Sequence, residues 1–168
     1  LLHEALTVSR ETLGNRHPHT LTSINNLGGL LKAKGDLAAA ELLYREALEV
    51  FRETLGSRHP STLTSITNLG LLLKAKGDLD AAESLHREAL EVSRETLGSR
   101  HPDTLASISN LGLLLLAKGD LAAADPLFRE AQKVRRETLG DRHPRTLNFI
   151  NCPGFCSSQL TLPSQPVY

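Results

Sequence analysis

The feature that most constrains this chain is an internal repeat of 42 residues. A Glu-Thr-Leu-Gly segment recurs with that step, and about four residues in five are identical between 11–52 and 53–94. The four copies begin at Glu11, Glu53, Glu95 and Glu137. A fixed period of this length is typical of solenoids and arrays, in which each unit packs only against its neighbours. The repeat therefore predicts an elongated stack of similar units.

The first half of each unit predicts a helix. In the first unit, Leu21, Ile24 and Leu27 follow helical spacing within the segment 20–34. A His-Pro pair stands directly before this segment in each unit, and proline suits a first helical turn, where its missing N–H costs nothing. The four pairs begin at His17, His59, His101 and His143.

The second half of each unit predicts a longer helix, over 37–55 in the first unit. Gly35 supplies the left-handed residue that ends the preceding helix, and Asp36 is a suitable N-cap for the next one. The apolar content is mainly Leu and Ala, and aromatic residues make up only 4% of the chain. That composition favours packed helices over a sheet.

Small residues recur at one place inside the first helices. Gly28, Gly70 and Gly112 each cost roughly 1 kcal/mol relative to Ala in a helix interior. Because every unit bears this cost, we expect a close approach between helices there. The large residues expected to fill the gaps between the small ones are Leu31, Leu73 and Leu115, together with Tyr44, His86 and Phe128.

The repeat divides the chain into six segments. The chain starts without Met in what reads as mid-helix, so we interpret it as a piece of a longer product. Pro153 falls where the other units continue their first helix, at a cost of about 3 kcal/mol or more, so the fourth unit is expected to break. The segments are a truncated second helix (1–13), repeats 1 to 3 (14–55, 56–97 and 98–139), the start of a broken fourth repeat (140–151) and a disordered tail (152–168).

The pattern Asn-Leu-Gly, Leu, Gly-Asp, and Ala-aromatic-Ala resembles the tetratricopeptide repeat. The 42-residue spacing with Leu-Gly-x-x-His-Pro-x-Thr, as in 55–62, resembles the kinesin light chain type of this repeat, and the resemblance covers 1–151. It implies an all-α, right-handed solenoid of antiparallel helix pairs with about seven helices. One departure is Ile24, with its equivalents Ile66 and Ile108, where many such repeats have Trp, and another is His86 in an aromatic position.

The resemblance also implies a binding surface. In tetratricopeptide superhelices the first helices line a concave groove, where a matching Asn often binds the backbone of an extended peptide. An amide suits this role because it offers both a donor and an acceptor. The equivalent residues here are Asn26, Asn68 and Asn110. The alternative is that these Asn side chains bond a local carbonyl or a neighbouring helix.

The neighbours of these Asn residues predict the character of the groove. They make it polar at one edge, apolar in the middle and basic in the first two units, which would suit a partner with a large apolar residue beside acidic ones. Lys32 and Lys74 are equally well explained as solvated helix ends. The neighbours are Asn25, Thr67 and Ser109, then Gly29, Leu71 and Leu113, then Lys32, Lys74 and Leu116.

Other functions find little support in the sequence. Lys and Arg together number 19, as do Asp and Glu, so no general field gathers nucleic acid or an anionic membrane. No apolar run of about 18 residues occurs, so no membrane span is expected. The His-Pro pairs lie a whole unit apart, too far to share a metal ion, and Cys152 and Cys156 lack a second ligand pair. We expect no enzyme activity, metal or cofactor, and a reducing, cytoplasmic compartment.

Two functional hypotheses follow, with a third outside the chain. The first is a protein-interaction scaffold that binds an extended peptide segment in its groove. The second is an architectural or oligomerising solenoid that associates end to end through apolar faces at its ends. The third, a regulatory arm of a larger signalling protein or enzyme, needs sequence beyond these residues.

Overall fold

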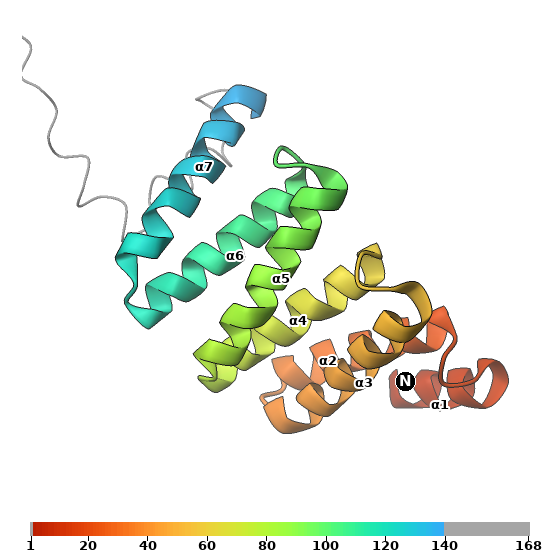
Figure 1. The fold of residues 1–168 in the computed structure, drawn as a ribbon. Helices are drawn as coiled ribbons and strands as arrows, with labels where there is room; N and C mark the ends of the chain where they lie inside the picture. Colours follow the sequence, from red (N-terminus) through yellow and green to blue (C-terminus); the bar gives the residue numbers. More distant parts are fainter. Residues whose placement is uncertain (1, 140–168) are drawn as a thin grey trace, which may run out of the picture.

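The computed structural model describes residues 2–139, and in that range the chain forms seven helices and no strand (Figure 1). The predicted all-α solenoid fold is confirmed, while the predictions for 140–151 and 152–168 lie outside the described residues. The helices are α1 (Leu2–Leu13), α2 (Pro18–Ala33), α3 (Leu37–Leu55), α4 (Pro60–Lys76), α5 (Leu79–Leu97), α6 (Pro102–Lys118) and α7 (Leu121–Leu139).

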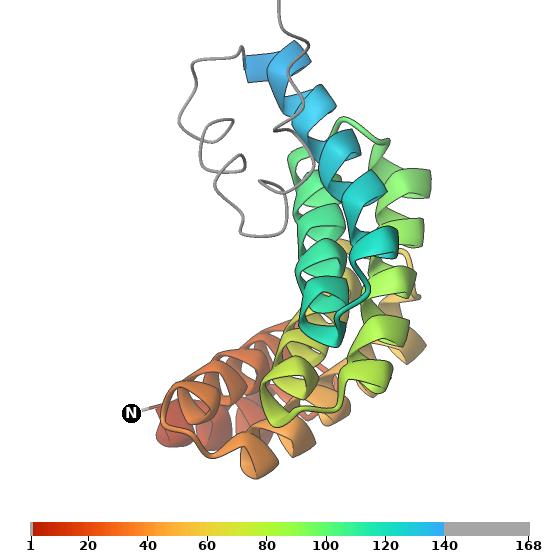
Figure 2. The same cartoon turned by 90° about the vertical axis from the view of Figure 1, so that its left-hand side faces the viewer.

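The helices stack in chain order into a curved array. Each helix packs against the next one, and α4 also contacts both α2 and α6 directly. Within 2–139 the helices α3, α5 and α7 make no such mutual contacts, so they are spaced further apart. Closer spacing on one side bends the stack toward that side, as Figure 2 shows. The inner face of the array is therefore formed by α2, α4 and α6.

The ends of the helices follow from the residues that the sequence singled out. The Nδ1 atom of His17 accepts a hydrogen bond from the backbone N–H of His19 at 3.2 Å, and His59 caps α4 in the same way. The carboxylate of Asp36 accepts from the backbone N–H of Ala39 at 3.1 Å. Gly77 adopts a φ of +87° after α4, a conformation that favours glycine. The His-Pro pairs of the first three units are thus helix starts, as predicted.

Aromatic and imidazole rings account for the glycines inside the first helices. A Cβ atom at Gly28 would lie 2.8 Å from Cε1 of Tyr44, and one at Gly112 would lie 2.8 Å from Cε1 of Phe128. At Gly70 the same atom would lie 2.9 Å from Cε1 of His86. The predicted close approach is therefore confirmed, and it is a ring of the second helix that lies against the glycine of the first.

A ladder of ion pairs connects each unit to the next. Arg10 on α1 binds Glu46 on α3 with N–O distances of 2.7 and 2.9 Å. The same contact recurs 42 residues later between Arg52 and Glu88 at 2.7 Å, and then between Arg94 and Glu130 at 2.6 Å. A second series lies within each unit and joins the loop before the first helix to the end of the second helix, with Arg58 2.7 Å from Glu95 as one member. The first series fixes the register of neighbouring units.

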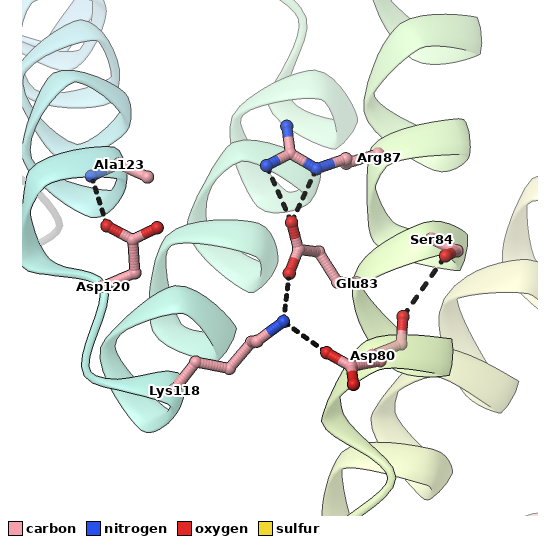
Figure 3. A network of polar contacts seen from close by, with 7 residues as sticks. All are labelled: Asp80, Glu83, Ser84, Arg87, Lys118, Asp120 and Ala123. Carbon is pink, nitrogen blue, oxygen red and sulfur yellow. Dashed lines mark hydrogen bonds and ion pairs between the residues drawn. The ribbon is translucent and has the colours of Figure 1, made fainter.

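Lysines at the ends of the first helices add a third set of contacts. Lys118 at the end of α6 reaches back to α5, where its Nζ lies 2.5 Å from Asp80 and 2.7 Å from Glu83 (Figure 3). Glu83 also accepts a hydrogen bond from Arg87 one turn along α5. Hydrogen bonds from Lys118 and then Arg87 hold the pKa of Glu83 below its ordinary value. The carboxylate thus links two helices of adjacent pairs.

Candidate functional site

The inner face carries a cleft where three helices meet. It is bounded by the starts of α4 and α6 and by the end of α5, and its volume is about 450 Å³. That size falls in the range of ligand-binding pockets. The cleft is lined by Arg58, Pro60, Leu63, Thr64, Thr67, Asn68, Ser93, Thr96, Leu97, Asp103, Ala106, Ser107 and Asn110.

Three of the predicted groove residues come together in this cleft. Thr67 and Asn68 project from α4 and Asn110 from α6, and all three are half-buried. Within the described range, neither Asn68 nor Asn110 makes a side-chain hydrogen bond to another residue. Their amides therefore keep both donor and acceptor capacity available to a ligand.

The remaining polar candidates are placed differently. Asn26 is exposed on α2, outside the cleft. The Nδ2 group of Asn25 donates to Ser65 Oγ at 2.9 Å and so connects α2 to α4. The hydroxyl of Ser109 donates to the carbonyl of Leu105 at 2.8 Å and accepts from Nη2 of Arg135 at 3.1 Å. Asn25 and Ser109 thus use their polar groups in contacts between helices.

The apolar and basic candidates lie further along the inner helices. Leu71 is half-buried and Leu113 is 41% exposed, so the middle of the inner face offers apolar surface. Lys32 is half-buried at the end of α2. The Nζ group of Lys74 donates to the backbone carbonyl of Leu113 at 3.2 Å, which ties α4 to α6. Leu71, Leu113 and these two lysines lie outside the 450 Å³ cleft.

Several cleft residues were missed by the sequence reasoning. The walls are formed by Leu63, Leu97 and Ala106, and the floor by the hydroxyls of Ser93 and Ser107. The available signal was an alignment of the second helices, because Ser93 occupies the position that Phe51 holds one unit earlier. A change from a large to a small residue at a buried position indicates space that its neighbours must fill or leave open.

A larger cleft of about 540 Å³ lies on the outer face, between α5 and α7. Three charged residues at its rim already have partners: Arg94 binds Glu130 of the next unit, while Glu95 binds Arg58 and Arg87 binds Glu83 within their own unit. The charges of these three groups are therefore largely compensated before any ligand arrives. The inner cleft, with its two free amides, is the better candidate for a binding site.

The described part of the chain brings no set of metal-ligating side chains together. Across residues 2–139 no three His, Cys, Asp or Glu side chains are close enough to hold a metal ion. His86 is buried at 1% exposure, and burial, aided by the charge of Lys74, lowers its pKa to about 4. Its Nε2 atom has no hydrogen-bond partner. His143, Cys152 and Cys156 lie outside the described residues.

The helices of residues 2–139 are 12 to 19 residues long. None of them combines the length and the apolarity that a bilayer crossing requires.

The repeat architecture and the sequence lead to the same family. The sequence profile of the tetratricopeptide repeat matches at 1–53, 33–95 and 61–137. The chain belongs to the tetratricopeptide repeat family. Members of this family are typically non-catalytic scaffolds with protein partners. No curated protein matches the chain.

Solved structures place this tetratricopeptide repeat protein near kinesin light chains. A Podosopora anserina protein described as a kinesin light chain with nearly identical TPR-like repeats is 29% identical, with a TM-score of 0.79; the match covers 88% of this chain and 70% of that one. A single-residue variant of it gives a TM-score of 0.80 at the same identity. BtubC (BKLC) from P. vanneervenii is 28% identical with a TM-score of 0.75, and the match covers 85% of this chain but 57% of BtubC. The predicted kinesin light chain type is thereby confirmed.

Proposed function

We propose that this protein is a scaffold that binds an extended segment of a partner protein along the inner face of α2, α4 and α6. The observation that carries the proposal is the pair of half-buried amides, Asn68 and Asn110, which lie in one cleft without intramolecular hydrogen bonds. An extended segment has unpaired backbone N–H and C=O groups at regular intervals. Two amides on successive helices can pair with such groups without demanding a particular sequence.

The rest of the inner face supports a choice of side chains on the partner. Leu71 and Leu113 offer apolar surface between the amides and the ends of the first helices. Lys32 and Lys74 add positive charge beside it. We therefore infer that the bound segment has a large apolar residue next to acidic ones. We also infer that binding takes place in a reducing, cytoplasmic compartment. Rim charges of this kind contribute more to association rate and selectivity than to affinity.

The test is the double substitution Asn68→Ala with Asn110→Ala. Peptides selected by display against the unaltered protein are titrated against both proteins by fluorescence polarisation, and thermal unfolding is followed by circular dichroism. We expect binding to weaken at least about tenfold, from the loss of about two hydrogen bonds, with an unchanged melting temperature. Asn15→Ala is the matched control, because that exposed amide lies in the loop before α2, outside the cleft and outside the inner helices. If affinity and melting temperature fall together, the amides are structural and the proposal is wrong.

A second candidate is association of the solenoid with itself. Leu30 on α2 is 36% exposed, whereas its equivalents Leu72 and Leu114 are fully buried against the preceding first helix. Leu121 at the start of α7 is 59% exposed. Apolar surface at both ends of residues 2–139 would favour end-to-end stacking. Multi-angle light scattering over a concentration series decides this, since a mass that stays at one chain contradicts stacking.

A further inference from the structure

The three second helices differ at one interior position. Phe51 occupies it in α3, Ser93 in α5 and Arg135 in α7. Phe51 and Ser93 are both buried, with 2% and 3% exposure. The guanidinium of Arg135 donates to Ser109 Oγ, so its side chain extends toward the first helix of its own unit. Among the three complete units only the second has a small side chain at this position, and the truncated second helix α1 carries Ser9 there.

The small side chain of Ser93 leaves space which a phenyl ring fills in the first unit. In the first unit Phe51 packs in one buried cluster with Leu21, which is 0% exposed. Leu63, the equivalent of Leu21, is only half-buried, and it lines the inner cleft together with Ser93. In the third unit Leu105 is again buried, with 7% exposure. The cleft therefore opens where the first unit holds a phenyl ring.

The floor of this space is polar. The hydroxyl oxygens of Ser93 and Ser107 are 3.5 Å apart, longer than the 2.7–2.8 Å typical of hydroxyl pairs. Ser107 donates its hydrogen to the carbonyl of Asp103 at 3.1 Å, so its oxygen can still accept. A purely apolar occupant would cover both hydroxyls without replacing the hydrogen bonds that water gives them. An occupant with its own hydroxyl at the tip would satisfy them.

We propose that the inner cleft is an anchor pocket for a tyrosine side chain of the bound segment. The ring lies between Leu63, Leu97 and Ala106, in the place that the ring of Phe51 takes one unit earlier, and the phenol hydroxyl binds at Ser93 and Ser107. This inference rests on the proposed function, because the tyrosine belongs to the segment that the inner face binds. Asn68 and Asn110 at the rim then bind backbone on either side of the anchor.

The pocket is tested directly with the isolated side-chain groups, p-cresol for tyrosine and toluene for phenylalanine. Each is titrated into the uniformly ¹⁵N-labelled protein, and backbone amide shifts are followed by NMR. We expect p-cresol to shift the amides of Leu63, Ser93 and Ser107 and to bind about fivefold more tightly than toluene, as one neutral hydrogen bond would give. Equal affinities, or no shifts at these residues, would overturn the proposal.

Two substitutions at one position provide matched controls. Ser93→Phe places in the second unit the residue that the first unit carries, and we expect p-cresol binding to disappear. Ser93→Ala leaves the space open and removes one hydroxyl, so it should reduce the preference for p-cresol over toluene to about twofold or less. If p-cresol binds Ser93→Phe as it binds the unaltered protein, the pocket is not the one described here. Ser93→Ala keeps the test valid even if the larger side chain disturbs folding.

Peptide binding separates this inference from the proposed function. Peptides selected against the unaltered protein should share a tyrosine, and their affinity should fall at least about tenfold for Ser93→Phe, as expected when an anchor side chain loses its pocket. Selected peptides that lack tyrosine, or that bind Ser93→Phe unchanged, refute the anchor and leave the groove proposal intact. Binding of p-cresol without any peptide binding has the opposite meaning, because the pocket then exists but does not serve a docked segment.

Discussion

The α2–α3 pair and the α4–α5 pair have nearly the same sequence but different interiors. Residues 11–52 and 53–94 differ at eight positions, and three of those pairs lie on or beside the interior: Gly29 and Leu71, Tyr44 and His86, Phe51 and Ser93. The first pair is closed by two aromatic rings, whereas the second carries a buried imidazole and an open cleft. The same backbone thus serves as rigid support in one unit and as a candidate binding site in the next.

These interior differences are coupled to one another. A Cβ atom at Gly29 would lie 3.5 Å from the hydroxyl oxygen of Tyr44, so the glycine leaves room for the phenol. Where the second unit has Leu71, the ring position holds the shorter His86. The third unit has Leu113 with Phe128, a ring without a hydroxyl. A ring moved from one unit to another should therefore be tolerated only where the residue at the position of Gly29 leaves enough room for it.

The largest effect is expected where the first pair is made to resemble the second. Phe51→Ser should lower the free energy of unfolding by about 3–4 kcal/mol, because a ring with 2% exposure is lost from the core. Urea unfolding followed by circular dichroism at 222 nm measures this. A loss below about 1 kcal/mol would contradict the supporting role of the ring, and Ser93→Phe provides the reciprocal variant.

As the pH falls, the α4–α5 pair should lose stability at a higher pH than the α2–α3 pair. The pKa of His86 is lowered to about 4 by burial and by Lys74, from an ordinary 6.5. In the unfolded chain the imidazole of His86 is therefore protonated below about pH 6.5, whereas in the folded chain it is protonated only below about pH 4. The free energy of unfolding should fall by about 3 kcal/mol as the pH drops across that window.

The control for this pH dependence is His86→Phe. The third unit has Phe128 at this position together with Leu113, the equivalent of Leu71, so the ring is compatible with its neighbour. Its urea-unfolding curves at pH 7 and pH 5 should lie closer together than those of the unaltered protein. Glu41 and Glu83 also have lowered pKa values, because of Lys76 and Lys118, but they lose their stabilising effect only as the pH falls below about 4.5. If the free energy of unfolding falls as much between pH 7 and pH 5 in the variant as in the unaltered protein, His86 is not the cause.

The smallest effect distinguishes two adjacent glycines of the first pair. Gly28→Ala should destabilise the protein by about 1–2 kcal/mol, because the new methyl group meets the ring of Tyr44 at 2.8 Å. Gly29→Ala makes only an ordinary 3.5 Å contact with the Tyr44 hydroxyl, so it should stabilise the helix by up to about 1 kcal/mol. If the melting temperature changes in the same direction for both variants, packing against Tyr44 does not decide whether a glycine-to-alanine substitution stabilises or destabilises the protein.

The helices and their ends could be predicted from the sequence because their signals are local or periodic. The helix expected over 37–55 is the observed α3, and Asp36 caps it as predicted. The glycine at 28 indicated a close approach, and Tyr44 was among the large residues expected beside it. Each of these inferences needs only the spacing of residues within one unit and its regular recurrence.

The cleft and the ladder could not be predicted in the same way, because both depend on contacts between units. Asn25 and Thr67 occupy equivalent positions, yet Asn25 bonds Ser65 across to α4 while Thr67 lines the cleft. Which role a residue takes depends on its neighbour in the next helix. Glu46 reads as part of a solvated helix face, and only the stacked structure brings it 2.7 Å from Arg10, 36 residues away.

The ladder also bears on how the length of such a chain can change. Arg10 with Glu46, Arg52 with Glu88, and Arg94 with Glu130 all join residues 36 apart, and successive pairs are offset by 42. Inserting or deleting one block of 42 residues would recreate every rung with the same partners and spacing. Unequal crossing-over within the gene would therefore yield longer or shorter proteins whose unit boundaries are already compatible. Proteins with different numbers of units would therefore need no new kind of interface between units.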